Sequence, residues 1–256
     1  MGGTESDREL PRRAGELLER VRARGPRVHV LTSPVAARRS ADTLAAVGAE
    51  PSMTARPRDL PDFLAAADAL VVNLGMLEHD REIAVDLATA VAEARRLPWL
   101  LDPVKLEMAG ARGRLARTLL ARSPAAVRLN RREAAHLAGR GPAEIAAGAR
   151  RLRTVLAVTG PVDLVTDGHR RVAIARGTPR LDRITATGCA LSALAGAFLA
   201  VEADAFLAIA AALLVFAVAA EVADARAAGP GTLAVHLLDA LADLDPATLR
   251  EGSDPR

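Results

Sequence analysis

The only cysteine of the chain, Cys189, stands where a turn of small residues runs into an apolar segment at 190–200. Small residues let backbone amides approach an anion, and the free amides and dipole at a helix start favour negative charge there. The turn therefore predicts a phosphate site, with Thr187, Gly188 and Cys189 as candidate catalytic residues. The same field lowers the pKa of a thiol, so we expect Cys189 to be partly ionised. A buried cysteine after an ordinary turn explains this stretch equally well.

Four polar residues each close an apolar run, and each of these runs is a predicted strand. They are Asn73, Asp102, Asn130 and Thr159. In an open α/β sheet, ligands bind in the crevice at the carboxyl ends of the strands. Taken singly, each residue is better explained as a helix cap or a turn residue. Their recurrence at one edge of the sheet favours a binding site.

Phosphoryl transfer from ATP requires a metal ion that bridges phosphates, cations or amides that hold them, and a group that positions the attacking hydroxyl. Asp102 and Glu133 can hold Mg²⁺, directly or through water, because this ion takes one or two carboxylates together with phosphate oxygens. Arg128 and Thr159 can contact the nucleotide phosphates. Glu133 also stands three positions after Asn130. Taken alone, that spacing is better explained by a capping box.

The elements that must position these residues follow an alternating order. Short β-branched or apolar runs alternate with segments rich in Ala, Leu, Arg and Glu, which is typical of helices covering a mostly parallel sheet. Strands are predicted at 27–31, 69–73, 99–102, 126–130 and 154–159, with a hairpin formed by 162–166 and 171–175. Helices are predicted at 7–24, 188–201, 205–227 and 231–243.

The length of 256 residues suits one compact domain spanning 1–256. The ends at 1–6 and 246–256, rich in Gly, Ser, Asp and Pro, are predicted to be frayed. A single cysteine excludes an intrachain disulfide and, with no secretory signal pattern, favours a cytoplasmic protein. The longest apolar run, 205–220, is shorter than the roughly 20 residues that span a bilayer, so we expect a buried helix and no membrane partner.

The charge pattern gives little support for a nucleic-acid partner. The formal net charge is +3, and Lys105 is the only lysine among basic residues that are otherwise arginines scattered among acids. Aromatic residues make up only 2% of the chain, so there is little on which bases can stack. The five histidines show no spacing typical of zinc ligands. We therefore expect small-molecule partners.

With these residues in place, the chain resembles the hydroxyethylthiazole kinase family, a branch of the ribokinase-like fold, from about residue 25 to 245. The resemblance implies a three-layer α/β/α fold with helices on both faces of a mostly parallel central sheet. Cys189 stands where most ribokinase-like enzymes have a catalytic aspartate, which points to the thiazole branch. The matching motifs are colinear, at 29–32, 48–53, 69–75, 101–104, 128–133, 158–163, 185–189 and 229–231.

The resemblance implies that the protein phosphorylates the primary alcohol of 4-methyl-5-(2-hydroxyethyl)thiazole with ATP and Mg²⁺, in thiamine biosynthesis and salvage. It also implies a homotrimer with sites at subunit borders. Site residues carry over by position, with the acceptor side formed by the turn ending at Cys189. The thiazole contacts would be Met53, Ala186, Thr32 and Asn73, the ATP contacts Arg128, Thr159 and Asn130, and the metal ligands Asp102 and Glu133.

Several positions depart from the family pattern. Ser33-Pro34 interrupts a loop that usually carries asparagines, and 105–107 is bulkier than the family's glycine-containing turn. Met76 replaces a threonine, and Ala186 replaces a glycine, which costs about 1 kcal/mol if that residue needs a positive φ. Two alternatives stay open: a diverged paralogue that binds a ligand without turnover, and a kinase of another hydroxymethyl heterocycle or sugar.

Overall fold

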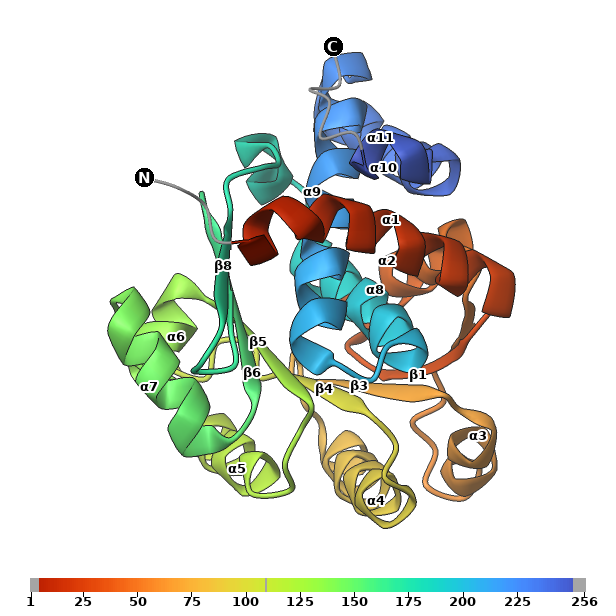
Figure 1. The fold of residues 1–256 in the computed structure, drawn as a ribbon. Helices are drawn as coiled ribbons and strands as arrows, with labels where there is room; N and C mark the ends of the chain where they lie inside the picture. Colours follow the sequence, from red (N-terminus) through yellow and green to blue (C-terminus); the bar gives the residue numbers. More distant parts are fainter. Residues whose placement is uncertain (1–4, 109, 251–256) are drawn as a thin grey trace.

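The protein is described by a computed structural model that covers residues 5–108 and 110–250 (Figure 1). Within these residues one eight-stranded sheet has the order β2-β1-β3-β4-β5-β6-β7-β8. The pairs from β2 through β6 are parallel, and β7 and β8 extend the sheet as an antiparallel hairpin. The strands are β1 (Arg27–Leu31), β2 (Glu50–Ser52), β3 (Ala69–Asn73), β4 (Trp99–Asp102), β5 (Ala126–Asn130), β6 (Val155–Thr159), β7 (Asp163–Thr166) and β8 (Arg171–Ile174).

The predicted strands are confirmed to within one residue at nearly every end, and β1, β3, β4 and β5 match at both ends. Parallel strands are covered on both faces, so they appear in the sequence as continuous apolar runs with clear limits. The strand β2 was not predicted. It has only three residues, Glu-Pro-Ser, which do not form an apolar run, and its proline is tolerated because β2 is an edge strand.

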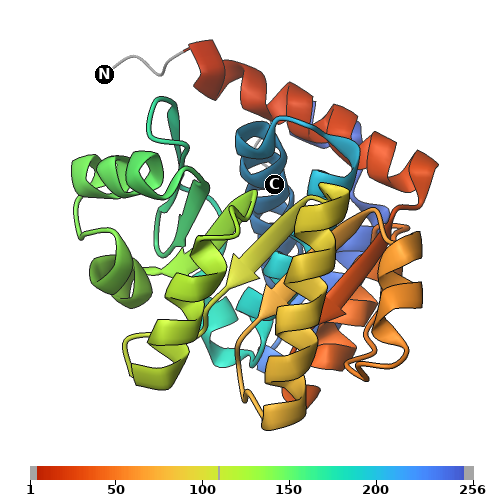
Figure 2. The same ribbon diagram turned by 90° about the horizontal axis from the view of Figure 1, so that it is seen from below.

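Helices cover both faces of the sheet, so the predicted three-layer α/β/α architecture is confirmed (Figures 1 and 2). One layer contains α1 (Glu5–Arg24), α2 (Pro34–Ala46), α8 (Thr187–Val201), α9 (Ala205–Arg226), α10 (Pro230–Asp243) and α11 (Pro246–Arg250). The other contains α3 (Leu60–Ala66), α4 (His79–Arg95), α5 (Gly110–Leu120), α6 (Arg131–Leu137) and α7 (Pro142–Leu152). Two clusters of buried apolar side chains, one under each layer, form the core.

The helix α9 is apolar around its whole circumference, as expected for a helix surrounded by protein. At 22 residues it is longer than the apolar run that predicted it, and by length and composition it could cross a membrane. Most of its side chains are instead buried, because α9 packs against α1, α8 and α10 as well as the sheet. The prediction of a buried helix is confirmed.

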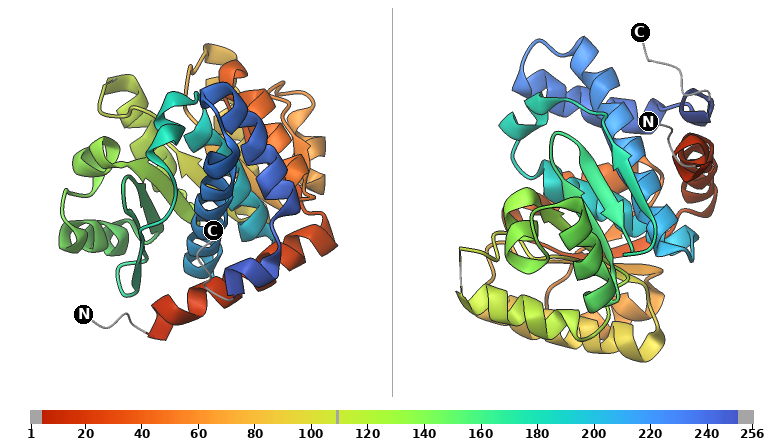
Figure 3. Two further views of the ribbon diagram at one scale, coloured as in Figure 1. Left: turned by 90° about the horizontal axis from the view of Figure 1, so that it is seen from above. Right: turned by 60° about the vertical axis from the view of Figure 1, so that its left-hand side comes forward.

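The C-terminal segment differs from the prediction. Residues 246–250 form α11, so the expectation of a frayed end does not hold for them. Leu249 is buried, and α11 lies against α1, so the last described helix packs beside the first (Figure 3). A single leucine that joins a core formed elsewhere is not visible as a local pattern. Residues 5 and 6 of the other predicted tail likewise belong to α1, so that expectation is also wrong for them. The rest of both tails lies outside the described part of the chain.

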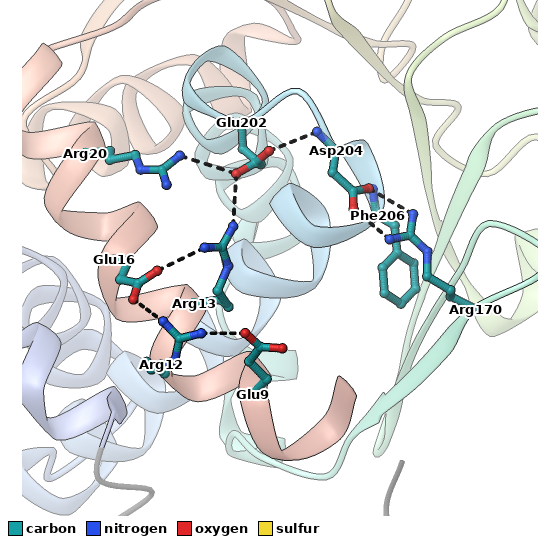
Figure 4. A network of polar contacts seen from close by, with 9 residues as sticks. All are labelled: Glu9, Arg12, Arg13, Glu16, Arg20, Arg170, Glu202, Asp204 and Phe206. Atoms are coloured by element: carbon teal, nitrogen blue, oxygen red, sulfur yellow. Dashed lines mark hydrogen bonds and ion pairs between the residues drawn. The ribbon is translucent and has the colours of Figure 1, made fainter. Parts of the chain in front are cut away.

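A network of ion pairs ties α1 to the loop before α9 and to the hairpin (Figure 4). Arg13 lies 3.6 Å from Glu202, and Arg170 pairs with Asp204 at 2.6 Å while lying over the ring of Phe206. The antiparallel register places this network at the amino ends of the parallel strands. A cavity of about 200 Å³ opens there, lined in part by both arginines, which are already ion-paired. It lies at the opposite edge of the sheet from the predicted site.

Candidate active site

The strand-end residues meet at one edge of the sheet, as predicted. Asn73 is the register partner of Asp102, and Asn130 is that of Thr159. The helix α8 begins at the same edge, because Cys189 accepts a hydrogen bond from Asn73 there. The turn before α8 and the carboxyl ends of four neighbouring strands therefore form one site.

Asp102 lies at the centre of this site and is completely buried. Its Oδ2 accepts hydrogen bonds from Asn73 Nδ2 at 2.9 Å and from Ser192 Oγ at 2.8 Å. Its Oδ1 has no hydrogen-bond partner among the described residues, and Arg128 Nη1 lies 4.0 Å from it. Burial raises the pKa of Asp102, although Arg128 opposes this shift. A buried acceptor without a partner is costly, so Oδ1 fits a site that binds a cation.

The thiol of Cys189 accepts a hydrogen bond from Asn73 Nδ2, with a nitrogen to sulfur distance of 3.2 Å. Burial and the nearby charge of Asp102 raise the pKa of Cys189 to about 11. The expectation of a lowered pKa is therefore wrong. The helix start does attract negative charge, but Asp102, which lies on a strand distant in sequence, repels a thiolate, and the surrounding protein partly buries the sulfur. At neutral pH Cys189 is a thiol.

We expect this raised pKa to make Cys189 slow to alkylate. At pH 8 the thiolate fraction should be about 100-fold lower than in the unfolded chain, because a pKa of about 11 exceeds the ordinary value of 9.0 by two. The alkylation rate should keep rising to pH 11. Since Cys189 is the only cysteine, iodoacetamide uptake measured against pH reports it directly, and urea-unfolded protein is the control. A midpoint below pH 9 in the folded protein would contradict this result.

Arg128 and Thr159, both predicted to contact ATP, lie together. Arg128 Nη2 donates to Thr159 Oγ1 at 2.7 Å, and Nε has no partner among the described residues. A Cβ built on Gly188 would lie 2.6 Å from Arg128 Nη1. The guanidinium is therefore in close contact with the first turn of α8, where only glycine leaves room for it. The guanidinium of Arg128 and the first turn of α8 therefore border the same part of the site.

The first turn of α8 is preceded by Ala186, which occupies the left-handed region with φ 66° and ψ 16°. The side chain of Ala186 cannot cap the helix, and no side-chain cap is formed there. Thr187 Oγ1 donates instead to Ile184 O at 3.3 Å, away from the amides. Amides at the start of a helix with no side-chain cap are available to an anion.

We expect Ala186→Gly to stabilise the protein by about 1 kcal/mol, because a Cβ is unfavourable at positive φ. For a chain of this size the melting temperature should rise by roughly 2–4 °C. Circular dichroism melts of the two proteins measure this change. Thr187→Gly, one residue further on and inside the helix, is the control and should lower the melting temperature. An unchanged or lower melting temperature for Ala186→Gly would show that the left-handed residue carries no strain.

Glu133, a predicted metal ligand, is almost completely buried and binds backbone amides through both oxygens. Oε2 accepts from Asn130 N at 2.7 Å and Oε1 from Lys105 N at 2.6 Å. Asn130 Oδ1 accepts in turn from the amides of Arg132 and Glu133, so the capping box is confirmed. Burial raises the pKa of Glu133, and the charge of Asp102 adds to the shift. Any contact with a metal would use the remaining lone pairs.

The segment after Asp102, where the family pattern has a glycine-containing turn, is left-handed at two non-glycine residues. Val104 has φ 36° and Lys105 has φ 54°. A β-branched residue rarely adopts this conformation, so the turn needs support from its surroundings. The hydrogen bond from Lys105 N to Glu133 and one from Arg112 Nη1 to Val104 O at 2.7 Å supply it.

The two remaining substrate candidates lie at the same edge. Thr32 follows β1, and its buried Oγ1 has no partner among the described residues. Met53 follows β2 and packs against the core. His29, which sequence reasoning missed, supports this segment through hydrogen bonds of 2.8 Å to Ser52 Oγ and 3.0 Å to Thr54 O, and burial lowers its pKa to about 4. A histidine inside an otherwise apolar strand was the available signal.

Asn73, predicted as a substrate contact, connects the other polar groups of the site through its side-chain amide. Both hydrogens of its side-chain amide are donated, one to Asp102 and one to Cys189, and its Oδ1 accepts from Gly75 N at 3.0 Å. Ser192, which also binds Asp102, was missed because a serine within an apolar helix carries no local sign of its partner.

Comparison with known proteins places this site in a family. The sequence pattern of the hydroxyethylthiazole kinase family matches residues 18–247. A probable hydroxyethylthiazole kinase of Agrobacterium fabrum is 42% identical over 232 residues, which cover 91% of this chain and 90% of that protein. The solved structure of a hydroxyethylthiazole kinase protein from Pyrococcus horikoshii OT3 superimposes with a TM-score of 0.90 at 35% identity, over 93% of this chain and 95% of that one.

A ribokinase-like superfamily protein from Enterococcus faecalis V583 has a TM-score of 0.65 at 14% identity, over 94% of this chain and 95% of that one. At that identity the likeness shows the fold alone. Together with the three-layer architecture it confirms the predicted ribokinase-like fold. The family pattern spans every strand-end residue and the turn before α8, and the matches at higher identity cover more than 90% of the chain. The chain belongs to the hydroxyethylthiazole kinase family.

Proposed function

We propose that the protein transfers the terminal phosphoryl group of ATP to the primary alcohol of 4-methyl-5-(2-hydroxyethyl)thiazole, in thiamine biosynthesis and salvage. The observation that carries the proposal is that the start of α8, which has no side-chain cap, contacts Arg128, and that Arg128 lies 4.0 Å from Asp102 Oδ1, which has no hydrogen-bond partner within the described residues. Hydrogen-bond donors of the helix start and Arg128, next to the carboxylate oxygen Oδ1, suit a phosphate together with its counter-ion. Membership of the hydroxyethylthiazole kinase family is the reason for proposing this thiazole alcohol as the phosphoryl acceptor.

Mg²⁺ fits the residues present. Oδ1 of Asp102 is a buried acceptor with no partner among the described residues, and Glu133 is close enough for the charge of Asp102 to raise the pKa of Glu133. Within 5–108 and 110–250 no group of three or more His, Cys, Asp and Glu side chains could hold a metal ion. Mg²⁺ suits such a site because it takes one or two carboxylates and completes its shell with phosphates and water. When bound, the ion would neutralise phosphate charge.

The other residues of the site bind and orient the reactants. Arg128, held by Thr159, would bind the nucleotide phosphates, and the amides at 187–189 would hold the transferred group. Cys189 would lie beside the acceptor alcohol as a neutral thiol and orient the hydroxyl by a hydrogen bond. Because the transition state of phosphoryl transfer is largely dissociative, it asks little of a base, and a neutral thiol is compatible with turnover.

A ligand-binding paralogue without turnover is the second candidate. It is favoured by the entrance of the site, where α2 begins at Pro34 directly after Ser33 and an exposed Lys105 stands in a left-handed turn. Both features alter the segments expected to surround the acceptor. A kinase of another heterocyclic or sugar alcohol has less support, because the sulfur of Cys189 stands where that branch has an aspartate.

One experiment separates these functions. The purified protein is incubated with ATP, Mg²⁺ and a panel of thiazole, pyrimidine and sugar alcohols, and phosphorylated products are detected by mass. Product from the thiazole alone supports the proposed function. Product from another alcohol reassigns the substrate. Thiazole binding by calorimetry without any product supports the binding protein.

We further infer a homotrimer, as the family resemblance implies, and a cytoplasmic location, which the single cysteine favours. Exposed apolar side chains support an interface near the site, since Val35, Met76 and Met108 lie on segments that follow β1, β3 and β4. Light scattering of the purified protein tests the trimer, and a monomeric mass at micromolar concentration would exclude it.

A further inference from the structure

Arg81 is a buried arginine that the reaction itself does not use. It is the third residue of α4 and only 8% exposed. Cations are disfavoured at the start of a helix, where the dipole is positive, and burying a guanidinium is costly. A residue placed against both effects needs compensation from specific partners. Arg81 finds them in the loop between β3 and α4.

Three carbonyl oxygens of that loop accept hydrogen bonds from Arg81. Nη2 donates to Asn73 O at 2.9 Å, and Nη1 donates to Gly75 O at 2.7 Å and to Met76 O at 2.8 Å. Met76 is left-handed, with φ 46°. The planar guanidinium therefore fixes a strained loop by holding three of its peptide groups at once, which the single ammonium of a lysine cannot reproduce.

This loop leads directly to the reacting groups. Gly75 N donates to Asn73 Oδ1 at 3.0 Å, and this bond sets the plane of the Asn73 amide. The nitrogen of that amide donates to Asp102 Oδ2 and to Cys189 Sγ. Displacing the loop would rotate the side-chain amide of Asn73 and weaken its hydrogen bonds to Asp102 and Cys189.

We propose that Arg81 is a positioning residue, which orients Asn73 through the 73–76 loop and so sets the relative placement of Asp102 and Cys189. It touches neither substrate nor nucleotide in this scheme. Its effect on turnover rests on the proposed kinase function, whereas its effect on Asn73 does not. The two can therefore be measured apart.

The chain offers a direct readout of Asn73. Asn73 and Asn130 are its only asparagines, and it contains no glutamine, so ¹⁵N-asparagine labelling gives side-chain amide signals from two residues only. Asn73→Ala assigns the Asn73 pair by removing it. In Arg81→Lys we expect this pair to move toward the shifts of a free asparagine, and its exchange with water to rise at least about tenfold. The Asn130 pair should stay in place.

Gly75→Ala perturbs the same link without touching the buried charge. Gly75 is not among the left-handed glycines, so alanine suits its backbone, but the new Cβ would lie 3.0 Å from Asn73 Oδ1. It should move the Asn73 signals in the same direction, and it decides the question if Arg81→Lys fails to fold. Arg22→Lys is the matched control, because Arg22 also donates to three carbonyls, those of Leu241, Ala242 and Leu244. It should leave the Asn73 signals unchanged.

Steady-state turnover is the second measurement. Arg81→Lys and Gly75→Ala should each lower kcat at least about tenfold while KM for ATP and thiazole changes less than about threefold. In an Asn73→Ala background, Arg81→Lys should change kcat less than about twofold, because its effect passes through Asn73. Unchanged Asn73 signals in folded Arg81→Lys, or in Gly75→Ala if Arg81→Lys does not fold, would overturn the proposal. Losses of kcat that multiply in the double variant would overturn it too. A wild-type protein without turnover would contradict only the proposed kinase function. The Asn73 side-chain amide signals would still test the role of Arg81.

Discussion

Asp102→Ala is expected to lower kcat on the order of 10³-fold, whereas Cys189→Ser should keep measurable turnover. Asp102 is the buried carboxylate whose Oδ1 has no partner in the part of the chain that the structure describes, so its removal takes away the group that fits the counter-ion of the phosphates. Cys189 is neutral at the pH of the assay because its pKa is about 11. A serine hydroxyl can donate the same hydrogen bond to the acceptor, so the loss should be smaller.

Steady-state kinetics with saturating ATP and thiazole measure both variants, and circular dichroism shows whether they fold. Ser192→Ala is the matched control. It removes one hydrogen bond to Oδ2 but leaves the charge and Oδ1 of Asp102, so kcat should fall less than about tenfold. Equal losses for Asp102→Ala and Cys189→Ser would contradict this division of roles, and would indicate that the thiol acts as a catalytic base.

The sheet and the location of the site could be predicted from the sequence because both depend on local patterns. Apolar runs buried on both faces define the strands, and a polar residue at the end of each run marks the edge where ligands bind. The parallel register then brings Asn73 to Asp102 and Asn130 to Thr159 without further information. Short or polar elements escape such reasoning, as the edge strand Glu50–Ser52 shows.

The chemistry within the site was less predictable because it depends on partners that are distant in sequence. The pKa of Cys189 is governed by burial and by Asp102 on another strand, not by the turn that precedes it. Arg81 gives no sequence signal, since its partners are backbone carbonyls. The positive φ of Val104 and Lys105 is also hidden, because neither is a glycine.

Gly188→Ala is expected to raise the Kd for ATP about tenfold or more without destabilising the fold. The new methyl group would lie 2.6 to 2.9 Å from the Nη1, Nη2 and Cζ atoms of Arg128, and a flexible side chain can move away from it. The guanidinium would then leave both the helix start and Thr159, to which it donates at 2.7 Å. Alanine favours a helix over glycine by up to about 1 kcal/mol, so the melting temperature should not fall.

Calorimetric titration with ATP and thermal melts measure the two effects, and Arg128→Ala should weaken ATP binding by a similar factor. The double variant should bind about as weakly as either single one, because both changes remove the same contact. Gly196→Ala on the same helix is the control. Its Cβ would lie 2.6 Å from Val71 Cγ2 and 2.9 Å from Val28 Cγ1, inside the packed core. It should cost roughly 1–3 kcal/mol of stability and leave the Kd for ATP unchanged. Losses of affinity that multiply in the double variant would mean that the added Cβ at position 188 weakens ATP binding independently of Arg128.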